Sequence, residues 1–245
     1  GAGIGGLTLA LTLHRSGIPC RVYEAAPEIK GLGLGINILP HATRELAELG
    51  LEDALAAVAV ATREAVFYNR FGQLVYSEPL GHHAGYDWPQ FSIHRGDLQA
   101  VLLAACNRRI GADRIFTGWR CARVEQDGDG AMVHFNSSAT GETLPPQRGA
   151  VAIGCDGIHS VVRKQLYPDE GDPIYSGVNM WRGATWWRPF LTGGSFVRAG
   201  WLESGKMIIY PIRNQRDARG YQLISWVGEF YTSKYKLRDW NRAGD

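Results

Sequence analysis

The sequence has few cysteines, and they are scattered along the chain. Cys20, Cys106, Cys121 and Cys155 form no CxxC pair, and the sequence has no histidine cluster at the spacing of metal ligands. This pattern argues against a structural zinc site, so no bound metal is predicted. We expect the thiols to be free, as they are in the reducing cytoplasm.

Long apolar runs and strong charge are also missing. No stretch approaches the roughly 18 consecutive apolar residues of a transmembrane helix, and no signal peptide opens the chain. Lysine and arginine total 26 against 24 acidic residues, which gives a net charge of +2 with no basic tract. The sequence therefore predicts a cytoplasmic protein with a small-molecule partner and neither a membrane nor a nucleic acid partner.

The sequence lacks the motifs of nucleophilic hydrolases. His159 stands beside Ser160, but no G-x-S-x-G elbow occurs and two adjacent side chains do not make a triad. No internal repeat, low-complexity segment or heptad pattern is present either. Catalytic residues consequently stay unassigned.

The first strong signal is a glycine-rich turn at the start of the chain. Gly1, Gly3 and Gly6 form a GxGxxG pattern before a helix predicted over 7–15, and a buried strand predicted over 18–24 ends on Glu24. In a dinucleotide site the first glycine permits the turn, the second admits the pyrophosphate and the third allows close packing of the helix. The acid at the end of the strand hydrogen-bonds ribose hydroxyls and disfavours a 2′-phosphate, which predicts FAD or NAD.

The glycines alone leave a purely structural turn as an alternative, and the position of Glu24, 18 residues after Gly6, argues against it. A native chain would normally begin with methionine, so we expect the strand before the turn to be missing from this sequence.

Further along the chain, the pattern predicts alternating helices and strands. The predicted elements are two helical pieces over 42–57 broken at Gly50, a hairpin over 65–77, a helix over 97–109, a hairpin over 119–136, a buried strand over 150–155, and long strands over 178–187, 206–212 and 221–228.

A second fingerprint follows the predicted strand over 150–155. It reads Gly154-Cys155-Asp156-Gly157-Ile158-His159-Ser160, with Arg163 three residues later. Three other stretches accompany it: GLGLGIN over 31–37, SIHRGDL over 92–98 and MWRG over 180–183. Together these motifs resemble the class A flavoprotein monooxygenases, whose second fingerprint reads roughly G-A-D-G-x-x-S-x-x-R, and the chain departs from that fingerprint only at Cys155.

The resemblance assigns roles to individual positions. The FAD-contacting arginine of the family falls on Arg95, the ribose acid on Glu24 and the DG-motif aspartate on Asp156. Each has a structural alternative, because Arg95 could cap surface carbonyls and Asp156 could cap the helix that follows. With Gly1, Gly3 and Gly6, these are the predicted cofactor-binding residues.

The resemblance covers nearly the whole chain and implies an α/β fold. It implies a Rossmann-like FAD-binding domain over 1–173, with a β-hairpin excursion and without its first strand. A mostly antiparallel β-sheet over 174–245 would then be an incomplete substrate-binding domain. Five tryptophans of that region (Trp181, Trp186, Trp187, Trp201 and Trp226) are either walls for a flat aromatic ligand or ordinary sheet core.

The resemblance also implies a reaction, and it is closest to the phenazine-modifying hydroxylases of the family. In these enzymes NADH or NADPH reduces FAD, and O2 captured as a flavin C4a-hydroperoxide hydroxylates an aromatic ring. A related epoxidase or dehydrogenase is the first alternative, while a halogenase is disfavoured because no W-x-W-x-I-P stretch occurs. The substrate, the ring position, the choice of NADH or NADPH and a homodimeric state are left open.

A non-catalytic flavin-fold fragment is the second alternative. The third fingerprint of the family, a Gly-Asp followed by an Ala-Ala-His-Pro-like run, is not found in these 245 residues. We therefore expect this chain to be truncated at both ends, and to bind FAD weakly when it is taken by itself.

Overall fold

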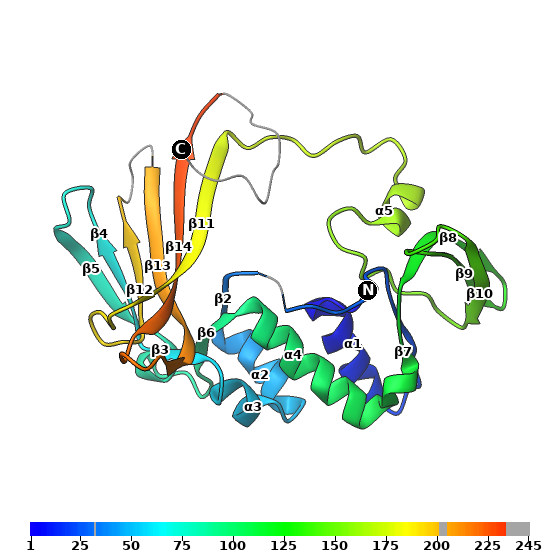
Figure 1. The fold of residues 1–245 in the computed structure, drawn as a ribbon, viewed down its shortest axis with the longest axis horizontal. Helices are drawn as coiled ribbons and strands as arrows, with labels where there is room; N and C mark the ends of the chain where they lie inside the picture. Colours follow the sequence, from blue (N-terminus) through cyan, green and yellow to red (C-terminus); the bar gives the residue numbers. More distant parts are fainter. Residues whose placement is uncertain (32, 201–204, 234–245) are drawn as a thin grey trace. The chain divides into compact units, whose positions relative to one another are not determined.

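The computed structural model describes residues 1–31, 33–200 and 205–233. The chain divides into two units, and each is assembled from two separate stretches of sequence (Figure 1). The first unit joins Gly1–Gly31 to Leu98–Asp172, and the second joins Leu32–Asp97 to Pro173–Asp245. The division into an FAD-binding domain over 1–173 and a substrate-binding domain over 174–245 stays a prediction.

The first unit combines helices with strands. Its elements are α1 (Ile4–Arg15), β1 (Val22–Glu24), most of α4 (Arg95–Cys106), a π-helical turn (Asn107–Gly111), a 3-10 turn (Ala112–Arg114), β7 (Ile115–Thr117), β8 (Trp119–Asp127), β9 (Gly130–Ser137), β10 (Thr143–Gly149) and α5 (Val161–Leu166).

The core of this unit forms where apolar side chains of α1 and α4 meet. Leu7, Leu11 and Leu102 are almost fully buried, which removes large aliphatic side chains from water. Cys106 is also buried, and its thiol donates to the carbonyl of Leu7 at 3.5 Å. Burial raises the pKa of the Cys106 thiol to about 11, so this cysteine is a core residue and not a reactive thiolate.

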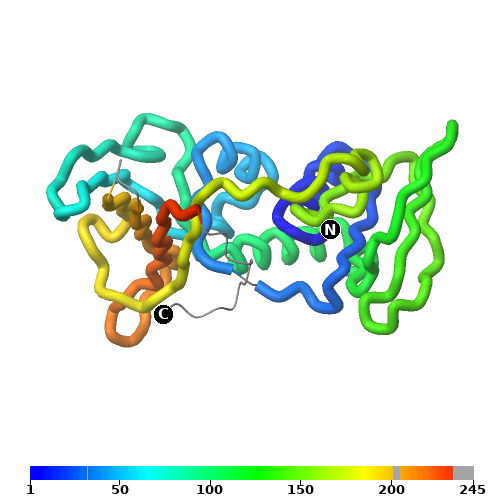
Figure 2. Tube along the Cα trace, turned by 90° about the horizontal axis from the view of Figure 1, so that it is seen from above, coloured from blue at the N-terminus to red at the C-terminus, as the bar shows by residue number. Residues whose placement is uncertain are grey.

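Two small sheets complete the first unit. β1 pairs in parallel with β7, and β8, β9 and β10 form an antiparallel sheet whose strands lie side by side in Figure 2. Aromatic rings connect the two sheets: Tyr23 of β1 stacks on Phe116 at 4.9 Å between centroids and contacts Phe135 of β9 at 4.6 Å. These contacts fix the strand that ends on Glu24.

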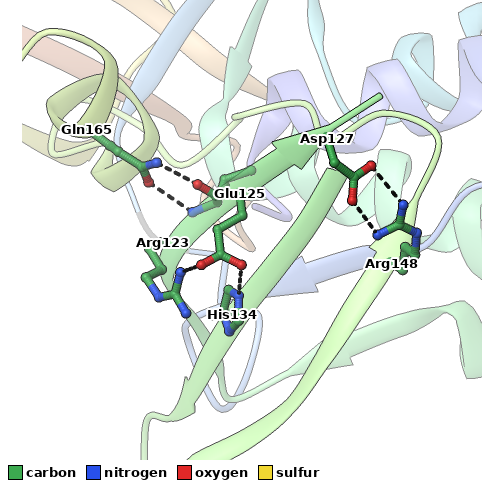
Figure 3. Close-up of polar contacts among 7 residues, drawn as sticks. Arg123, Glu125, Asp127, His134, Arg148 and Gln165 are labelled. Atoms are coloured by element: carbon green, nitrogen blue, oxygen red, sulfur yellow. Dashed lines mark hydrogen bonds and ion pairs between the residues drawn. The ribbon is translucent and has the colours of Figure 1, made fainter. Parts of the chain in front are cut away.

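Polar contacts attach α5 to the three-stranded sheet (Figure 3). The side-chain amide of Gln165 pairs with the backbone of Val124, accepting from its N–H at 2.9 Å and donating to its carbonyl. Across the sheet, Arg148 makes two hydrogen bonds to Asp127, at 2.8 and 3.0 Å. The amide pair holds the last turn of α5 against β8.

Two strand predictions for this unit are wrong: one strand is shorter than predicted and the other is absent. The strand predicted over 18–24 is confined to Val22–Glu24, because Ile18 still donates its N–H to the carbonyl of Leu13 and Pro19 has no N–H to give. The buried strand predicted over 150–155 is not formed, and Val151 is 73% exposed. No strand among the described residues pairs with that segment, and an unpaired apolar run has no ladder to join.

The second unit is dominated by strands. Its elements are β2 (Gly35–Ile38), α2 (Pro40–Glu48), α3 (Glu52–Ala56), β3 (Val60–Thr62), β4 (Glu64–Tyr68), β5 (Leu74–Pro79), a 3-10 turn (Gly81–Ala84), β6 (Gln90–His94), the first residues of α4, β11 (Val178–Trp187), β12 (Ser195–Ala199), β13 (Gly205–Arg216) and β14 (Gln222–Tyr231).

Two sheets organise these strands (Figure 1). A six-stranded sheet has the order β11-β14-β13-β12-β4-β5, with only β12 and β4 parallel, and a three-stranded sheet has the order β2-β6-β3. Phe67, Phe196, Tyr210 and Ile212 are buried together as a core on the larger sheet. The predicted long strands and the hairpin over 65–77 are confirmed. Trp201 lies outside the described residues.

Among the described residues, none of the helices combines the length and hydropathy that a bilayer crossing requires. Within the same residues, His, Cys, Asp and Glu side chains form no group of three or more that could hold a metal ion.

The indole of Trp226 occupies the space above Gly183 on the neighbouring strand β11. A Cβ added to Gly183 would lie 2.5 Å from the ring, whereas a Cβ on Gly228 would meet no atom closer than 4.0 Å. We predict that Gly183→Ala lowers the free energy of unfolding by about 1 to 3 kcal/mol through overpacking. The matched Gly228→Ala should raise it slightly by restricting the unfolded chain. Urea unfolding of both variants tests this, and equal stability of the two would contradict the packing described.

Candidate functional site

The glycine turn at the start of the chain packs closely against the loop that precedes α5. A Cβ added to Gly1 would lie 2.3 Å from the carbonyl oxygen of Cys155, and one added to Gly6 would lie 1.9 Å from the carbonyl oxygen of Gly1. The Cβ added to Gly6 would also lie 3.3 Å from the Cβ of Cys155. Only glycine fits at Gly1 and Gly6, because every other side chain would separate the turn, the helix and the loop.

Gly3 differs from these two glycines, since nothing in the described chain requires glycine there. Its backbone has φ −72° and ψ 179°, a conformation open to any residue, and no atom lies within 4 Å of an added Cβ. Gly3 is also the N-cap of α1, and no side chain caps the helix. The first-turn N–H groups and the positive end of the helix dipole therefore adjoin open space, as an anion-binding site requires.

Glu24 is held beside the turn by two backbone groups. Its Oε2 accepts from the N–H of Ala2 and its Oε1 accepts from the N–H of Ala26, each at 2.7 Å. The carbonyl of Ala2 in turn accepts from the side-chain amide of Gln99 at 2.8 Å. A carboxylate offers about four lone-pair positions, so the fixed side chain can still accept from two further donors such as ribose hydroxyls.

The carboxylate of Asp156 lies at the start of α5, whose N-cap residue is Ser160. Its Oδ1 accepts from the hydroxyl of Ser160 at 2.6 Å, and its Oδ2 accepts from the N–H of Val161 at 2.7 Å and of Val162 at 3.3 Å. Partial burial acts to raise the pKa of Asp156, but the hydrogen bonds from Ser160 and from these backbone groups outweigh it and hold the pKa below its usual range. The carboxylate is thus ionised, and its role as a helix cap is a property of the structure.

Arg95 belongs to the second unit and begins α4. Its backbone N–H donates to the carbonyl of Leu34 at 2.8 Å, and its aliphatic stem lies 3.2 Å from where a Cβ of Gly33 would stand. Gly33 has φ +124°. Glycine is therefore favoured at this position both by the backbone conformation and by the close approach of Arg95. The side chain is exposed, and its guanidinium has no hydrogen-bonded partner among the described residues, which leaves it available to a ligand.

The structure therefore brings five of the six predicted residues together in the first unit. These are Gly1, Gly3, Gly6, Glu24 and Asp156, whose Cα lies 3.6 Å from the Cβ position of Gly1. Arg95 is part of the other unit. Sequence reasoning did not find Gln99, which anchors Ala2, because a lone glutamine in a helix carries no recognisable signal.

A further contact not expected from the sequence fixes the start of α4. Asp97, two residues after Arg95, accepts two hydrogen bonds from the guanidinium of Arg213 on β13, at 2.7 and 2.9 Å. The pair joins the helix that carries Arg95 to the six-stranded sheet. No local pattern could have found it, since the two residues are 116 positions apart.

The glycine turn, the helix and the acid-ended strand are those of an α/β nucleotide-binding fold. The family of FAD binding domains matches residues 1–236, and the chain belongs to that family. This confirms the resemblance to flavoproteins and the α/β fold with an antiparallel sheet predicted from the sequence.

Characterised relatives share much of this chain. Phenazine 1,6-dicarboxylic acid hydroxylase PhzS of Lysobacter antibioticus is 42% identical over 93% of this chain and 56% of its own length. The 3-amino-4-hydroxybenzoate 2-monooxygenase of Streptomyces cremeus is 36% identical over 75% of this chain and 44% of its own length. The chain thus spans about half the length of these relatives.

Solved structures have the same fold. The structure of Klebsiella pneumoniae HpxO complexed with FAD and uric acid superposes with a TM-score of 0.79 at 25% identity, covering 98% of this chain and 57% of that chain. The 2,6-dihydroxypyridine-3-hydroxylase of Arthrobacter nicotinovorans superposes with a TM-score of 0.69 at 26% identity, covering 94% and 55%.

The lowered pKa of Asp156 links stability to pH. Because the folded pKa lies below the unfolded value of about 3.9, the ionised side chain stabilises the fold above that value, and this contribution is lost as pH falls through the folded pKa. We predict that Asp156→Asn lowers stability at neutral pH and flattens the loss of stability on acidification below about pH 5. Urea unfolding between neutral and acidic pH measures this, with Asp169→Asn, an exposed carboxylate just beyond α5, as control. Parallel pH profiles for the wild type and Asp156→Asn would refute the assignment.

Proposed function

We propose that this chain binds FAD and forms part of an FAD-dependent aromatic monooxygenase. The observation that carries the proposal is the open space at Gly3, beside the uncapped start of α1 and the fixed carboxylate of Glu24. The residues present fit the cofactor. A pyrophosphate bound at this turn would need the space beside Gly3, and the described chain leaves that space open.

Each residue of the site has a task in this proposal. The N–H groups at the start of α1 bind the pyrophosphate, and Gly3 lets the phosphate oxygens approach the backbone. Glu24 accepts hydrogen bonds from the ribose, held in place by Ala2 and Ala26. The guanidinium of Arg95 donates to the cofactor, and Asp156, which caps α5, orients the Gly154–Gly157 loop beside Gly1.

The reaction follows from the chemistry that bound FAD supplies, which is transfer of electrons from NADH or NADPH to O2. An aromatic ring, O2, NAD(P)H and a proton give a hydroxylated ring, water and NAD(P)⁺. The named relatives support an aromatic substrate, since they include hydroxylases of phenazine dicarboxylic acid and of an aminohydroxybenzoate. The chain's own contribution is to bind the cofactor, orient it and exclude water from the reacting atoms.

Product analysis tests the reaction. The gene product that contains this chain is supplied with NADH or NADPH, O2 and a panel of phenols, hydroxybenzoates and phenazine carboxylic acids. We expect at least one ring to gain a single oxygen atom, with one NAD(P)H consumed per product. Consumption of NAD(P)H that yields only hydrogen peroxide with every compound would reject the monooxygenase assignment.

Substitution at Gly3 separates cofactor binding from folding. In the gene product, Gly3→Val should weaken FAD binding by at least about tenfold, because the branched side chain fills the space of the pyrophosphate. Stability should fall by only about 1 kcal/mol, the cost of a poorer N-cap. The control is Gly5→Val, since a Cβ at Gly5 also meets nothing within 4 Å but occupies a variable position of the motif. Flavin fluorescence titration gives the affinities, and unchanged FAD binding by Gly3→Val would place the cofactor elsewhere.

The role of Glu24 is tested in the same assay. Glu24→Ala removes the acceptor for the ribose hydroxyls and should weaken FAD binding by about 1 to 3 kcal/mol. Glu28→Ala is the control, because Glu28 is exposed and pairs with Lys30 at the surface. An FAD affinity equal to that of the wild type would remove Glu24 from the ribose.

A further inference from the structure

A cavity of about 270 Å³ opens in the second unit, apart from every residue assigned to the cofactor. It lies at the start of β3, the end of β13 and the start of β14, beside the loop between β11 and β12. Its apolar wall is formed by Ala59, Val60 and Phe91, which are 2%, 7% and 2% exposed. A volume of this size, at the small end of ligand pockets, suits a small molecule and not a dinucleotide.

The charge of the cavity is positive. Arg63 and Arg216 line it, both are exposed, and neither guanidinium has a carboxylate partner among the described residues. None of the described residues that line the cavity is an aspartate or a glutamate. Two unpaired guanidiniums at one cavity favour an anion, and arginine is suited to carboxylates because its N–H groups match both oxygens.

A buried acceptor without a donor also lines the cavity. Gln222 is 5% exposed, and its Nε2 donates to the carbonyl of Gly193 at 3.1 Å, which fixes the orientation of the amide. Its Oε1 is buried and accepts no hydrogen bond from the described residues. An unsatisfied buried acceptor is unfavourable, so a ligand N–H or O–H that reached it would be stabilised.

The loop between β11 and β12, which lines the cavity, has a strained backbone. Leu191 has φ +49°, in the left-handed region that residues other than glycine rarely adopt. Gly194 approaches so closely that an added Cβ would lie 2.8 Å from the carbonyl oxygen of Ala61 and 3.2 Å from the Cγ of Arg63. Thr192 and Ser195 share a hydrogen bond of 2.8 Å between their hydroxyls. Backbone strain of this kind is found preferentially at ligand sites.

We propose that this cavity is a second binding site, which takes a small carboxylic acid bearing a hydroxyl or amino group. The carboxylate lies between Arg63 and Arg216, the hydroxyl or amino hydrogen points to Oε1 of Gln222, and the carbon skeleton packs on Val60 and Phe91. None of the residues named for this site is assigned to FAD, so the proposal of a second site can be tested separately from the proposed function.

The test uses the ¹⁵N-labelled gene product that contains this chain and three probes: 4-hydroxybenzoate, benzoate and inorganic phosphate. The side-chain amide signal of Gln222 should shift saturably with 4-hydroxybenzoate, and more weakly with benzoate, which cannot donate to Oε1. Arg63→Gln and Arg216→Gln should each weaken binding of 4-hydroxybenzoate by at least about tenfold. The control is Arg70→Gln in the turn after β4, at the opposite end of that strand from Arg63.

A further variant isolates the buried acceptor. Gln222→Met retains the size of the side chain but not the amide, so it should bind 4-hydroxybenzoate and benzoate equally, as followed by calorimetry. Three results would overturn the proposal: no saturable shift of the Gln222 amide with either acid, equal binding by Arg70→Gln and the two cavity arginine variants, or phosphate binding at least as tightly as the acids.

Discussion

The close approach of three backbone segments around the glycine turn is the constraint on which the candidate site depends. The turn touches the loop at Cys155, the carbonyl of Gly1 lies against α1 at Gly6, and Glu24 binds the N–H of Ala2. Side chains at Gly1 or Gly6 would break this packing. Because the turn is held on three sides, the start of α1 and the carboxylate of Glu24 have a fixed geometry before any ligand is present.

The same constraint explains why the three motif glycines are not equivalent. Gly1 and Gly6 are required by the protein's own backbone, whereas Gly3 faces space that the described residues leave open. Gly3 also lies at the uncapped start of α1 and beside Glu24, and this combination is most simply explained by a ligand. Farther out, the hydrogen bond from Gln99 to Ala2 supports the turn, and the contact of Gln165 with Val124 attaches α5 to β8.

Much of this arrangement was predictable from local sequence. The glycine pattern, the helix after it and the hairpin turns depend on neighbouring residues, and the helix near 97–109 and the long strands over 178–187, 206–212 and 221–228 were also predicted. The strand expected over 150–155 failed because strand formation needs a partner, which an apolar run alone does not reveal.

Contacts between distant residues could not be predicted. The pair of Asp97 with Arg213 and the cavity of Arg63, Arg216 and Gln222 join residues from separate parts of the second unit, and each residue is unremarkable in its own segment. Membership of the FAD binding domain family agrees with the motifs but does not assign individual contacts. Those depend on the geometry of the folded chain.

The central claim is that the start of α1 holds the pyrophosphate of FAD. A crystal structure of the gene product with FAD tests it most directly. The account predicts a pyrophosphate oxygen within about 3 Å of a first-turn N–H, adjacent to Gly3, with the ribose hydroxyls on Glu24. A pyrophosphate bound away from this helix would contradict it.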